Sequence, residues 1–323
     1  PVNEFTGTCV ALSGGVGGAK LALGLSRILA PAQLDIIVNT GDDFEHLGLM
    51  ICPDLDTLTY TLAGLNNTET GWGRAGETWS FMASLRALGG ESWFQLGDGD
   101  LAIHVERTRR LAAGEPLSRV MVELTARLGI ELSVIPMSDD PVRTFVETAA
   151  GALAFQHYFV RDQCAPEVTG FEFRGAKTAT PSPMALSALA DPALDAVVIC
   201  PSNPFISIDP ILAVPGLRGA IEDAAAPVIA VSPIVGGKAI KGPTAKMMLE
   251  LGVTQSAASV ARHYDGLIDG FVLDSEDAAS GDEIRALGLD VLSTNTVMQS
   301  LEDRVSLAAN VLEFATKLRS KSK

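Results

Sequence analysis

The chain has 323 residues, of which 47% are hydrophobic, and its formal charge at pH 7 is −15. This length and apolar content are enough for one large domain or two modest ones with a packed core. The acidic excess argues against nonspecific binding to nucleic acid or to an anionic membrane, because both need a basic surface. An anionic ligand would have to be held locally, by backbone amides, a few basic side chains or a metal ion.

The four cysteines are widely separated and form no C-x-x-C pair, which favours reduced core residues over a zinc site or a disulfide framework. Apolar runs are interrupted by Pro, Ser and Gly before they reach the length of a membrane span. The first residues also lack the charged-then-apolar pattern of a secretory signal. We therefore expect a cytoplasmic enzyme.

The most informative stretch is a glycine-rich turn at 13–21, Ser-Gly-Gly-Val-Gly-Gly-Ala-Lys-Leu. It follows a short apolar run typical of a strand, and the apolar spacing over 19–29 predicts a helix that Pro31 ends. Glycines allow close backbone approach and a helix N-terminus presents unpaired N–H groups, so we expect a phosphate or carboxylate cradle. The spacing matches neither G-x-G-x-x-G nor the Walker P-loop, and a tight turn without a ligand is the alternative. The residues assigned to the cradle are Gly14, Gly15, Val16, Gly17, Gly18 and Lys20.

Strand patterns alternate with helical ones along most of the chain, beginning with a strand-helix-strand unit over 9–39. Strands are predicted at 34–39, 132–135, 195–200, 228–231, 271–274 and 290–292, with two more at 153–160 and 171–173 as an antiparallel edge. This alternation predicts an α/β fold with a doubly wound, mostly parallel Rossmann-like sheet, whose ligands bind beyond the carboxyl ends of the strands. We expect one domain over 1–323, with a mainly helical insertion at about 56–130 and a closing amphipathic helix over 301–318.

Carboxylates are concentrated in two short segments, Asp42-Asp43 after a predicted strand and Asp54-Leu-Asp56 before a predicted helix. If these segments meet at the sheet edge, their oxygens could hold one hard cation. Mg²⁺ fits, because it combines one or two protein carboxylates with substrate phosphates and water. N-capping of the helix by one of the two later carboxylates is a compatible alternative. The four histidines are isolated, and no spacing supports a hydrolase triad.

Two further loops follow predicted strands on the same edge of the sheet, at 202–203 and 236–238. Their backbone and side-chain donors could fix a nucleotide base or phosphate. All three tryptophans lie near glycine and acidic loops, where they could stack on a planar ring, although core packing is the commoner role.

Seven segments, taken together and in order, carry a resemblance that spans roughly residues 9 to 300. They are 13–21, 38–43, 51–57, 96–98, 136–141, 201–204 and 230–234. In combination they resemble the 2-phospho-L-lactate transferase family (CofD, or FbiA) of coenzyme F420 biosynthesis. The glycine turn departs from the archaeal Gly-Gly-Thr-Gly-Thr pattern, so donor contacts can differ.

The resemblance implies a magnesium-dependent transferase. The donor would be a guanylylated phospho-acid, and the acceptor would be FO, 7,8-didemethyl-8-hydroxy-5-deazariboflavin. The terminal ribityl hydroxyl of FO would attack the phosphorus that carries the organic acid, and GMP would leave. Lactate, enolpyruvate and glycerate all remain open as the acid.

The resemblance also implies roles for individual residues. Asp42, Asp43 and Asp56 would hold the metal, and Asp42 and Asp56 would act in catalysis, with Asp56 close to the FO hydroxyl. Gln95 would contact FO. Ser202, Asn203 and Pro204 would lie on the guanosine side, and a homodimer is expected. The competing interpretation is a non-catalytic nucleotide-sugar or dinucleotide-binding regulator of the gluconeogenesis-factor type, which would need the glycine turn but not the carboxylates.

Overall fold

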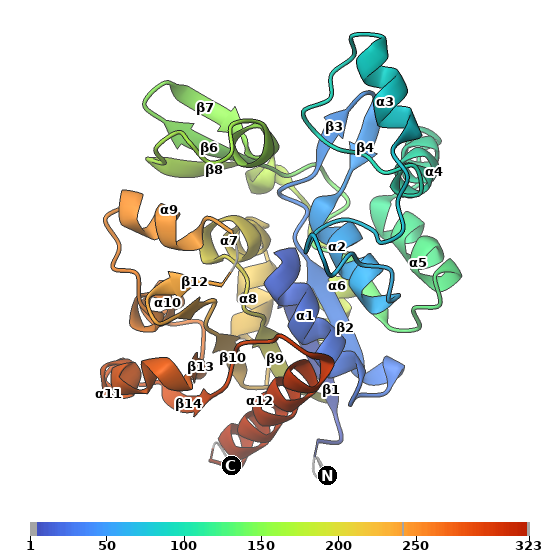
Figure 1. Ribbon diagram of the computed structural model, residues 1–323. Helices are drawn as coiled ribbons and strands as arrows, with labels where there is room; N and C mark the ends of the chain where they lie inside the picture. Colours follow the sequence, from blue (N-terminus) through green and yellow to red (C-terminus); the bar gives the residue numbers. More distant parts are fainter. Residues whose placement is uncertain (1–4, 241, 322–323) are drawn as a thin grey trace.

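The centre of the molecule is a seven-stranded sheet in the order β14-β13-β10-β9-β1-β2-β5 (Figure 1). The computed structural model describes residues 5–240 and 242–321. Every neighbouring pair in this sheet is parallel. The predicted doubly wound α/β fold is therefore confirmed. Its strands are β1 (Thr8–Ser13), β2 (Leu34–Val38), β5 (Ser133–Pro136), β9 (Leu194–Ile199), β10 (Val228–Val231), β13 (Gly270–Asp274) and β14 (Asp290–Thr294).

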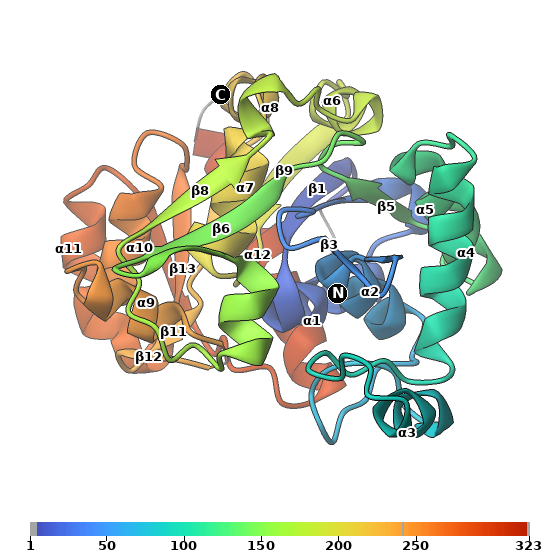
Figure 2. The same ribbon diagram turned by 90° about the horizontal axis from the view of Figure 1, so that it is seen from above.

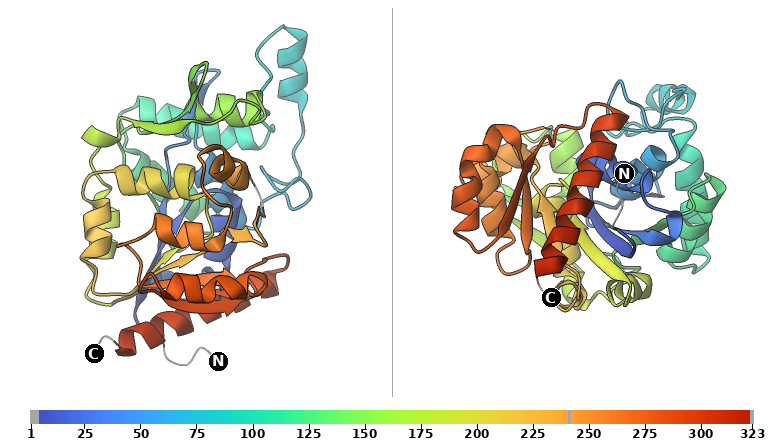
Figure 3. Two further views of the ribbon diagram at one scale, coloured as in Figure 1. Left: turned by 90° about the vertical axis from the view of Figure 1, so that its left-hand side faces the viewer. Right: turned by 90° about the horizontal axis from the view of Figure 1, so that it is seen from below.

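Successive residues of β1 enter two different hydrophobic cores, one on each face of the sheet. Cys9 and Ala11 pack with α1 (Gly15–Ser26) and α12 (Leu301–Lys321). Val10 and Leu12 face the opposite core. Figure 3 shows α12 lying across the strands. Because helices cover both faces, the central strands are almost continuously apolar.

Helices on the second face come from the later part of the chain. They are α6 (Pro183–Leu189), α7 (Asp209–Ala213), α8 (Leu217–Glu222), α9 (Thr244–Glu250), α10 (Ala257–His263) and α11 (Gly281–Arg285). Within the described residues, no helix combines the length and apolar character required to cross a lipid bilayer.

The order of the strands creates a crevice beside β1. The chain runs from β1 outward through β2 to β5, then returns to the other side of β1 as β9 and continues outward to β14. The loops that follow β1 and β9 therefore leave the sheet in different directions, and such a switch point is where open α/β sheets bind ligands.

Four helices and a hairpin lie between β2 and β5 in the chain. The first and last of these helices pack with α1 against one face of the sheet, whereas the two middle helices and the hairpin stand above one end of it (Figures 1 and 2). The helices are α2 (Pro53–Leu62), α3 (Ser80–Ala87), α4 (Asp100–Ala112) and α5 (Leu117–Arg127), and the hairpin pairs β3 (Phe44–His46) with β4 (Leu49–Ile51). The four helices agree with the predicted mainly helical character of the segment at about 56–130, although α2 begins at Pro53. The hairpin was not predicted, because each of its strands has only three residues.

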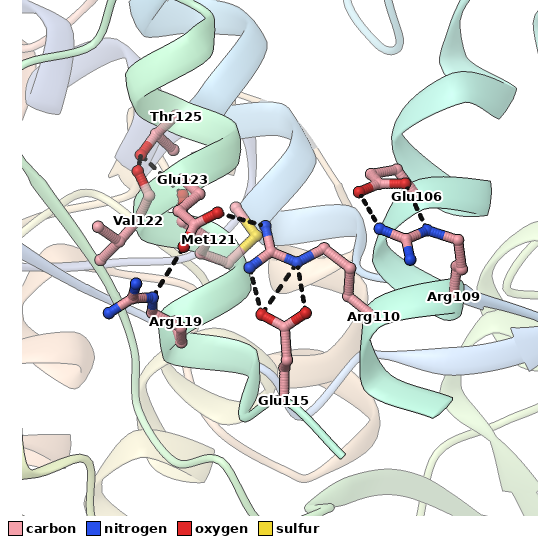
Figure 4. A network of polar contacts seen from close by, with 9 residues as sticks. All are labelled: Glu106, Arg109, Arg110, Glu115, Arg119, Met121, Val122, Glu123 and Thr125. Atoms are coloured by element: carbon pink, nitrogen blue, oxygen red, sulfur yellow. Dashed lines mark hydrogen bonds and ion pairs between the residues drawn. The ribbon is translucent and has the colours of Figure 1, made fainter. Parts of the chain in front are cut away.

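A polar network joins α4 to α5 (Figure 4). The guanidinium of Arg110 binds Glu115 at 3.0 Å and Glu123 at 3.1 Å, and Glu123 also accepts a hydrogen bond from Arg119. The Arg110 side chain is nearly buried. This network fixes the orientation of α4, which carries residues of the site described below.

A second, three-stranded antiparallel sheet has the order β7-β6-β8 and stands apart from the central sheet. It contains β6 (Arg143–Thr148), β7 (Gly151–Ala154) and β8 (Gly170–Arg174). The strand predicted over 153–160 is wrong beyond Ala154, because His157–Arg161 forms a π-helical turn. Phe155 and Tyr158 are buried at a spacing of three residues, which is helical rather than extended. The strand at 171–173 exists, but in this separate sheet.

Candidate active site

The glycine stretch forms the first turn of α1, which begins at Gly15 rather than after the glycines and ends at Ser26, well before Pro31. Gly15 has a φ of +65°, and its N–H donates to Asp54 Oδ1 at 2.6 Å. A Cβ at Gly17 would lie 2.2 Å from the carbonyl oxygen of Pro201. The first N–H groups of a helix have no partner within it. The loops after β1 and β9 are in close contact, and this contact holds the first N–H groups of α1 at the switch point.

Ser202 holds this turn in place. Its Oγ donates to the Gly14 carbonyl oxygen at 2.8 Å and accepts from the Gly14 N–H at 3.2 Å. Asn203 caps the π-helical turn Pro204–Ile208, because its Oδ1 accepts from the Phe205 N–H at 3.0 Å. Both side chains line the same cavity as the glycine turn, but their hydrogen bonds fix protein backbone.

Two buried carboxylates meet beside the turn. Burial, and then the charges of Asp54 and Asp43, raise the pKa of Asp42 well above its usual range. Burial also raises the pKa of Asp54 to about 6, although hydrogen bonds from Asn39 and Gly15 oppose the shift. The Oδ1 atom of Asp42 has no hydrogen-bond partner. A buried carboxylate whose ionised form is destabilised by burial and by a neighbouring carboxylate suits a bound cation.

The other two predicted metal ligands differ in position, because only Asp56 faces the cavity. Asp43 does not line the cavity, and its carboxylate lies close to Cys52 and to the cation of Arg143. Asp56 lines the cavity, but the guanidinium of Arg107 contacts both of its oxygens. In the described part of the chain, no three His, Cys, Asp or Glu side chains form a group that could hold a metal. The structure thus gathers Asp42, Asp54 and Asp56 on the cavity wall and turns Asp43 away from it.

The alternative role of Asp54 and Asp56 as N-caps does not hold. Helix α2 begins at Pro53 with Cys52 at the N-cap position, so both carboxylates lie in the first helical turn. Asp54 instead joins the glycine turn to the end of β2, because its Oδ1 accepts from the Gly15 N–H and its Oδ2 accepts from Asn39 Nδ2 at 2.9 Å.

A polar cluster on α4 that no sequence motif indicated lies next to Asp56. The Nδ1 of buried His104 is 3.6 Å from Asp56 Oδ2, and its Nε2 is 3.1 Å from Asp100 Oδ2. The Tyr60 hydroxyl donates to the other oxygen of Asp100. Asp100, His104 and Arg107 recur at helical spacing. Polar residues on one face of a predicted helix were therefore the sequence feature that could have predicted this cluster.

The cavity has a volume of about 610 Å³, a size typical of small-molecule sites. Four carboxylates and the ammonium of Lys20 line it, and Lys20 Nζ donates to the Met298 carbonyl oxygen at 2.9 Å. Gln95 also lines the cavity, and its Nε2 donates to the Ser92 carbonyl oxygen at 2.7 Å. The carboxylates are Asp42, Asp54, Asp56 and Asp100. An anionic ligand in this cavity needs a cation as well as backbone donors.

Comparison with known proteins identifies the chain's relatives. The family model described as 2-phospho-L-lactate transferase CofD matches residues 9–302. The chain belongs to the CofD family. This CofD-family chain is 42% identical over 317 residues to a Streptomyces griseus protein named phosphoenolpyruvate transferase, covering 96% of this chain and 99% of the relative. It is 37% identical over 305 residues to a Methanococcoides burtonii protein named 2-phospho-L-lactate transferase, and the match covers 94% of this chain and 98% of that protein.

These matches show that the CofD-family chain is an enzyme, a transferase. A crystal structure of a UPF0052-family protein from Bacillus halodurans superposes with a TM-score of 0.62, covering 95% of this chain and 99% of that one. The two sequences are 16% identical, and the likeness shows the fold alone.

Proposed function

We propose that this CofD-family transferase moves a phospho-organic-acid group from a GDP-type activated donor to the terminal ribityl hydroxyl of FO, with release of GMP, in coenzyme F420 biosynthesis. The names of the two relatives support this proposal for the transferred group, phosphoenolpyruvate in one and 2-phospho-L-lactate in the other. The enolpyruvyl, lactyl and glyceryl donors are separate arms of the experiment below.

The main support for the proposal is that the first turn of α1 and the buried carboxylates Asp42 and Asp54 line the same cavity. The N–H groups of Gly14 and Gly15 bind Ser202 and Asp54, so the anion donors would be the N–H groups that follow Gly15 in the first turn of α1, and the buried Asp42 and Asp54 lie next to that turn. Backbone N–H groups at a helix start suit a diphosphate. Carboxylates that lack a compensating charge suit the cation that accompanies a diphosphate.

The residues present fit a magnesium ion, because Asp42 Oδ1 is buried without a partner and Asp54 lies close by. Asp42 and Asp54 would hold the ion, with Asp56 as the third carboxylate on the wall. When bound, the ion would neutralise the diphosphate and the charge that develops on departing GMP.

The chain's own residues would orient the two substrates. The glycine turn, held by Ser202, would bind the diphosphate oxygens. The Asp56 carboxylate, fixed by Arg107, would accept a hydrogen bond from the attacking hydroxyl. A bond forms between that hydroxyl oxygen and the phosphorus bearing the organic acid, the bond from this phosphorus to the GMP oxygen breaks, and the hydroxyl proton leaves to a carboxylate or water.

The test is a mass-spectrometric transfer assay with FO, Mg²⁺ and each guanylylated acid in a separate reaction. With at least one donor we expect two products, free GMP and an ester of FO with the phospho-acid. We expect neither product when EDTA is present. Asp42→Asn should abolish product formation, whereas Asp282→Asn, at an exposed carboxylate on α11, should not. If folded protein makes no product from any donor, the proposal is wrong and the regulator becomes the better hypothesis.

We also propose that the enzyme is cytoplasmic and acts as a homodimer. Light scattering on the purified protein measures the oligomeric state, and a monomer at assay concentrations would contradict the second part.

A further inference from the structure

The mouth of the cavity carries large apolar side chains that face solvent. Trp72, Ile240 and Phe159 all line the cavity, although they are 53%, 48% and 39% exposed. Trp72 lies between α2 and α3, and Phe159 lies in the π-helical turn after β7. Ile240 lies between β12 (Lys238–Ala239) and α9. We call these three side chains the apolar rim.

Contact across the mouth would bury the apolar rim. Moving apolar surface out of water is favourable, and the effect grows with the area that is covered. The Trp72 indole is the largest and the most exposed of the three side chains. Covering it would therefore remove more apolar surface from water than covering either of the other two.

Trp72 stands on a loop whose base is fixed. Asn66 and Arg74 form an antiparallel bridge that closes the loop. Arg74 lies 3.7 Å from one carboxylate oxygen of nearly buried Glu77, and the other oxygen accepts from the Gly99 N–H at 2.6 Å. Gly99 occupies the N-cap position of α4. The base of the loop is thereby tied to the helix that carries Asp100 and His104.

The tip of the loop has more freedom than its base. Trp72 lies between Gly71 and Gly73, which have φ values of +72° and +71°. A Cβ at Gly73 would meet nothing within 4 Å, so neighbouring atoms do not confine the backbone there. Glycine adopts either sign of φ at little cost, so the indole can change direction between the two glycines while the base stays in place. The hydrogen bond of 2.7 Å from Thr70 Oγ1 to the Trp72 carbonyl oxygen is the contact that this movement would alter.

The proposed reaction has a competitor that such a movement would suppress. Water can attack the same phosphorus in place of the acceptor hydroxyl. A bond then forms between the water oxygen and the phosphorus, the bond to the GMP oxygen breaks, and a water proton leaves to a carboxylate or to solvent. The products are the free phospho-acid and GMP. Closure of a loop over a reaction site excludes water and so protects an activated donor.

We propose that Gly71-Trp72-Gly73 is a lid, whose indole moves onto Ile240 and Phe159 when both substrates are bound. Trp72 thereby favours transfer to the acceptor hydroxyl over transfer to water. This inference rests on the proposed function. The contact that closes the lid lies within one chain and is made with the apolar rim.

Hydroxyl-radical footprinting, measured by mass spectrometry of peptides, tests the closure. We expect the oxidation rate of Trp72 to fall severalfold when FO, GDP and Mg²⁺ are present together. Trp79 is the internal control, because it is 41% exposed but does not line the cavity, and its rate should not change. Ile240→Ser removes part of the surface onto which the lid closes, so Trp72 should be less protected in this variant.

The ratio of free phospho-acid to FO ester tests the consequence of closure. With FO and the donor both present, Trp72→Ala should raise this ratio by about fivefold or more, because water then reaches the donor. Trp72→Phe keeps an apolar ring and should have a smaller effect. Trp79→Ala is the matched control and should leave the ratio unchanged.

The outcomes separate the lid from the proposed function. If the protein makes the FO ester but substrates leave the oxidation rate of Trp72 unchanged, the lid is wrong while the proposed function stands. Full protection of Trp72 in Ile240→Ser would mean that a substrate covers the indole directly, and it would contradict the lid. Protection that appears without substrates and grows with protein concentration would place a second copy on the rim, and would also contradict it. If no donor yields the ester, the proposed function fails and this inference fails with it.

Discussion

The guanidinium of Arg107, which has no exposed surface, contacts both carboxylate oxygens of Asp56 across 51 residues of sequence. The Nη1 to Oδ2 distance is 3.1 Å. Helix α4 thereby fixes a carboxylate of α2 on the cavity wall, and its own orientation depends on the network with α5 in Figure 4. The position of the Asp56 carboxylate therefore depends on the packing of α4 against α2, and not on helix α2 alone.

Arg107→Met should destabilise the protein strongly. Removing one partner of a buried ion pair leaves an uncompensated charge, and we expect the free energy of unfolding to fall by about 3–5 kcal/mol. Urea unfolding measures the change. Arg109→Met, on the same helix but exposed and paired with Glu106, is the control and should have little effect. Adding Asp56→Asn to Arg107→Met should recover part of the loss. Equal effects of the two single variants would contradict a structural role for the pair.

Gly17→Ala should weaken donor binding. The added methyl group would meet the Pro201 carbonyl oxygen at 2.2 Å, so the β1 and β9 loops must separate. Such overpacking costs about 1–3 kcal/mol and displaces the N–H donors. We expect the dissociation constant for GDP to rise tenfold or more, and a tenfold rise corresponds to about 1.4 kcal/mol of binding free energy.

Gly219→Ala is the control for that substitution, because a Cβ at Gly219 on α8 meets nothing within 4 Å. Calorimetry should find its GDP affinity unchanged. Unchanged affinity in Gly17→Ala as well would show that the close approach of the two loops is not needed for binding.

The stability of the metal-free protein should fall as the pH rises from about 4 to 7. Burial raises the pKa of Asp43 from 3.8 to about 7, even though Arg143 and Arg107 oppose the shift. Between these values the folded chain binds a proton that the unfolded chain has lost, so each pH unit costs up to about 1.4 kcal/mol. Urea unfolding in EDTA across this range measures the slope. Asp43→Asn should make the slope shallower, and an identical slope in that variant would exclude Asp43 as its source.

Ser202→Ala should impair catalysis by loosening the glycine turn. The variant loses both hydrogen bonds to Gly14, and a net loss of about 1 kcal/mol corresponds to about a fivefold lower kcat/KM for the donor. Ser256→Ala is the control, since Ser256 caps α10 and makes the same kind of hydrogen bond to backbone. We expect it to lower stability by about 1 kcal/mol and leave kcat/KM unchanged. A similar loss of kcat/KM in both variants would indicate a general effect of reduced stability.

Periodicity was sufficient to predict the central sheet and most helices, because strands buried on both faces are uninterrupted apolar runs and the helices carry regular apolar faces. It failed where the elements are short. The β3–β4 hairpin has three residues in each strand, and the segment after β7 turns into a π-helix because Phe155 and Tyr158 bury their side chains on one side.

The residue pattern alone predicts that a glycine turn, an Asp42-Asp43 loop and a Ser202-Asn203 loop follow parallel strands and so share one edge of the sheet. Which of their groups face the cavity became known from the packing of the folded chain. Asp54 joins Asp42 there while Asp43 turns away, and Phe159 with His104 comes from segments with no motif. The reason is physical: order along a strand fixes the edge on which a loop lies, but the direction of each side chain depends on partners such as Asn39, Arg107 and Arg143.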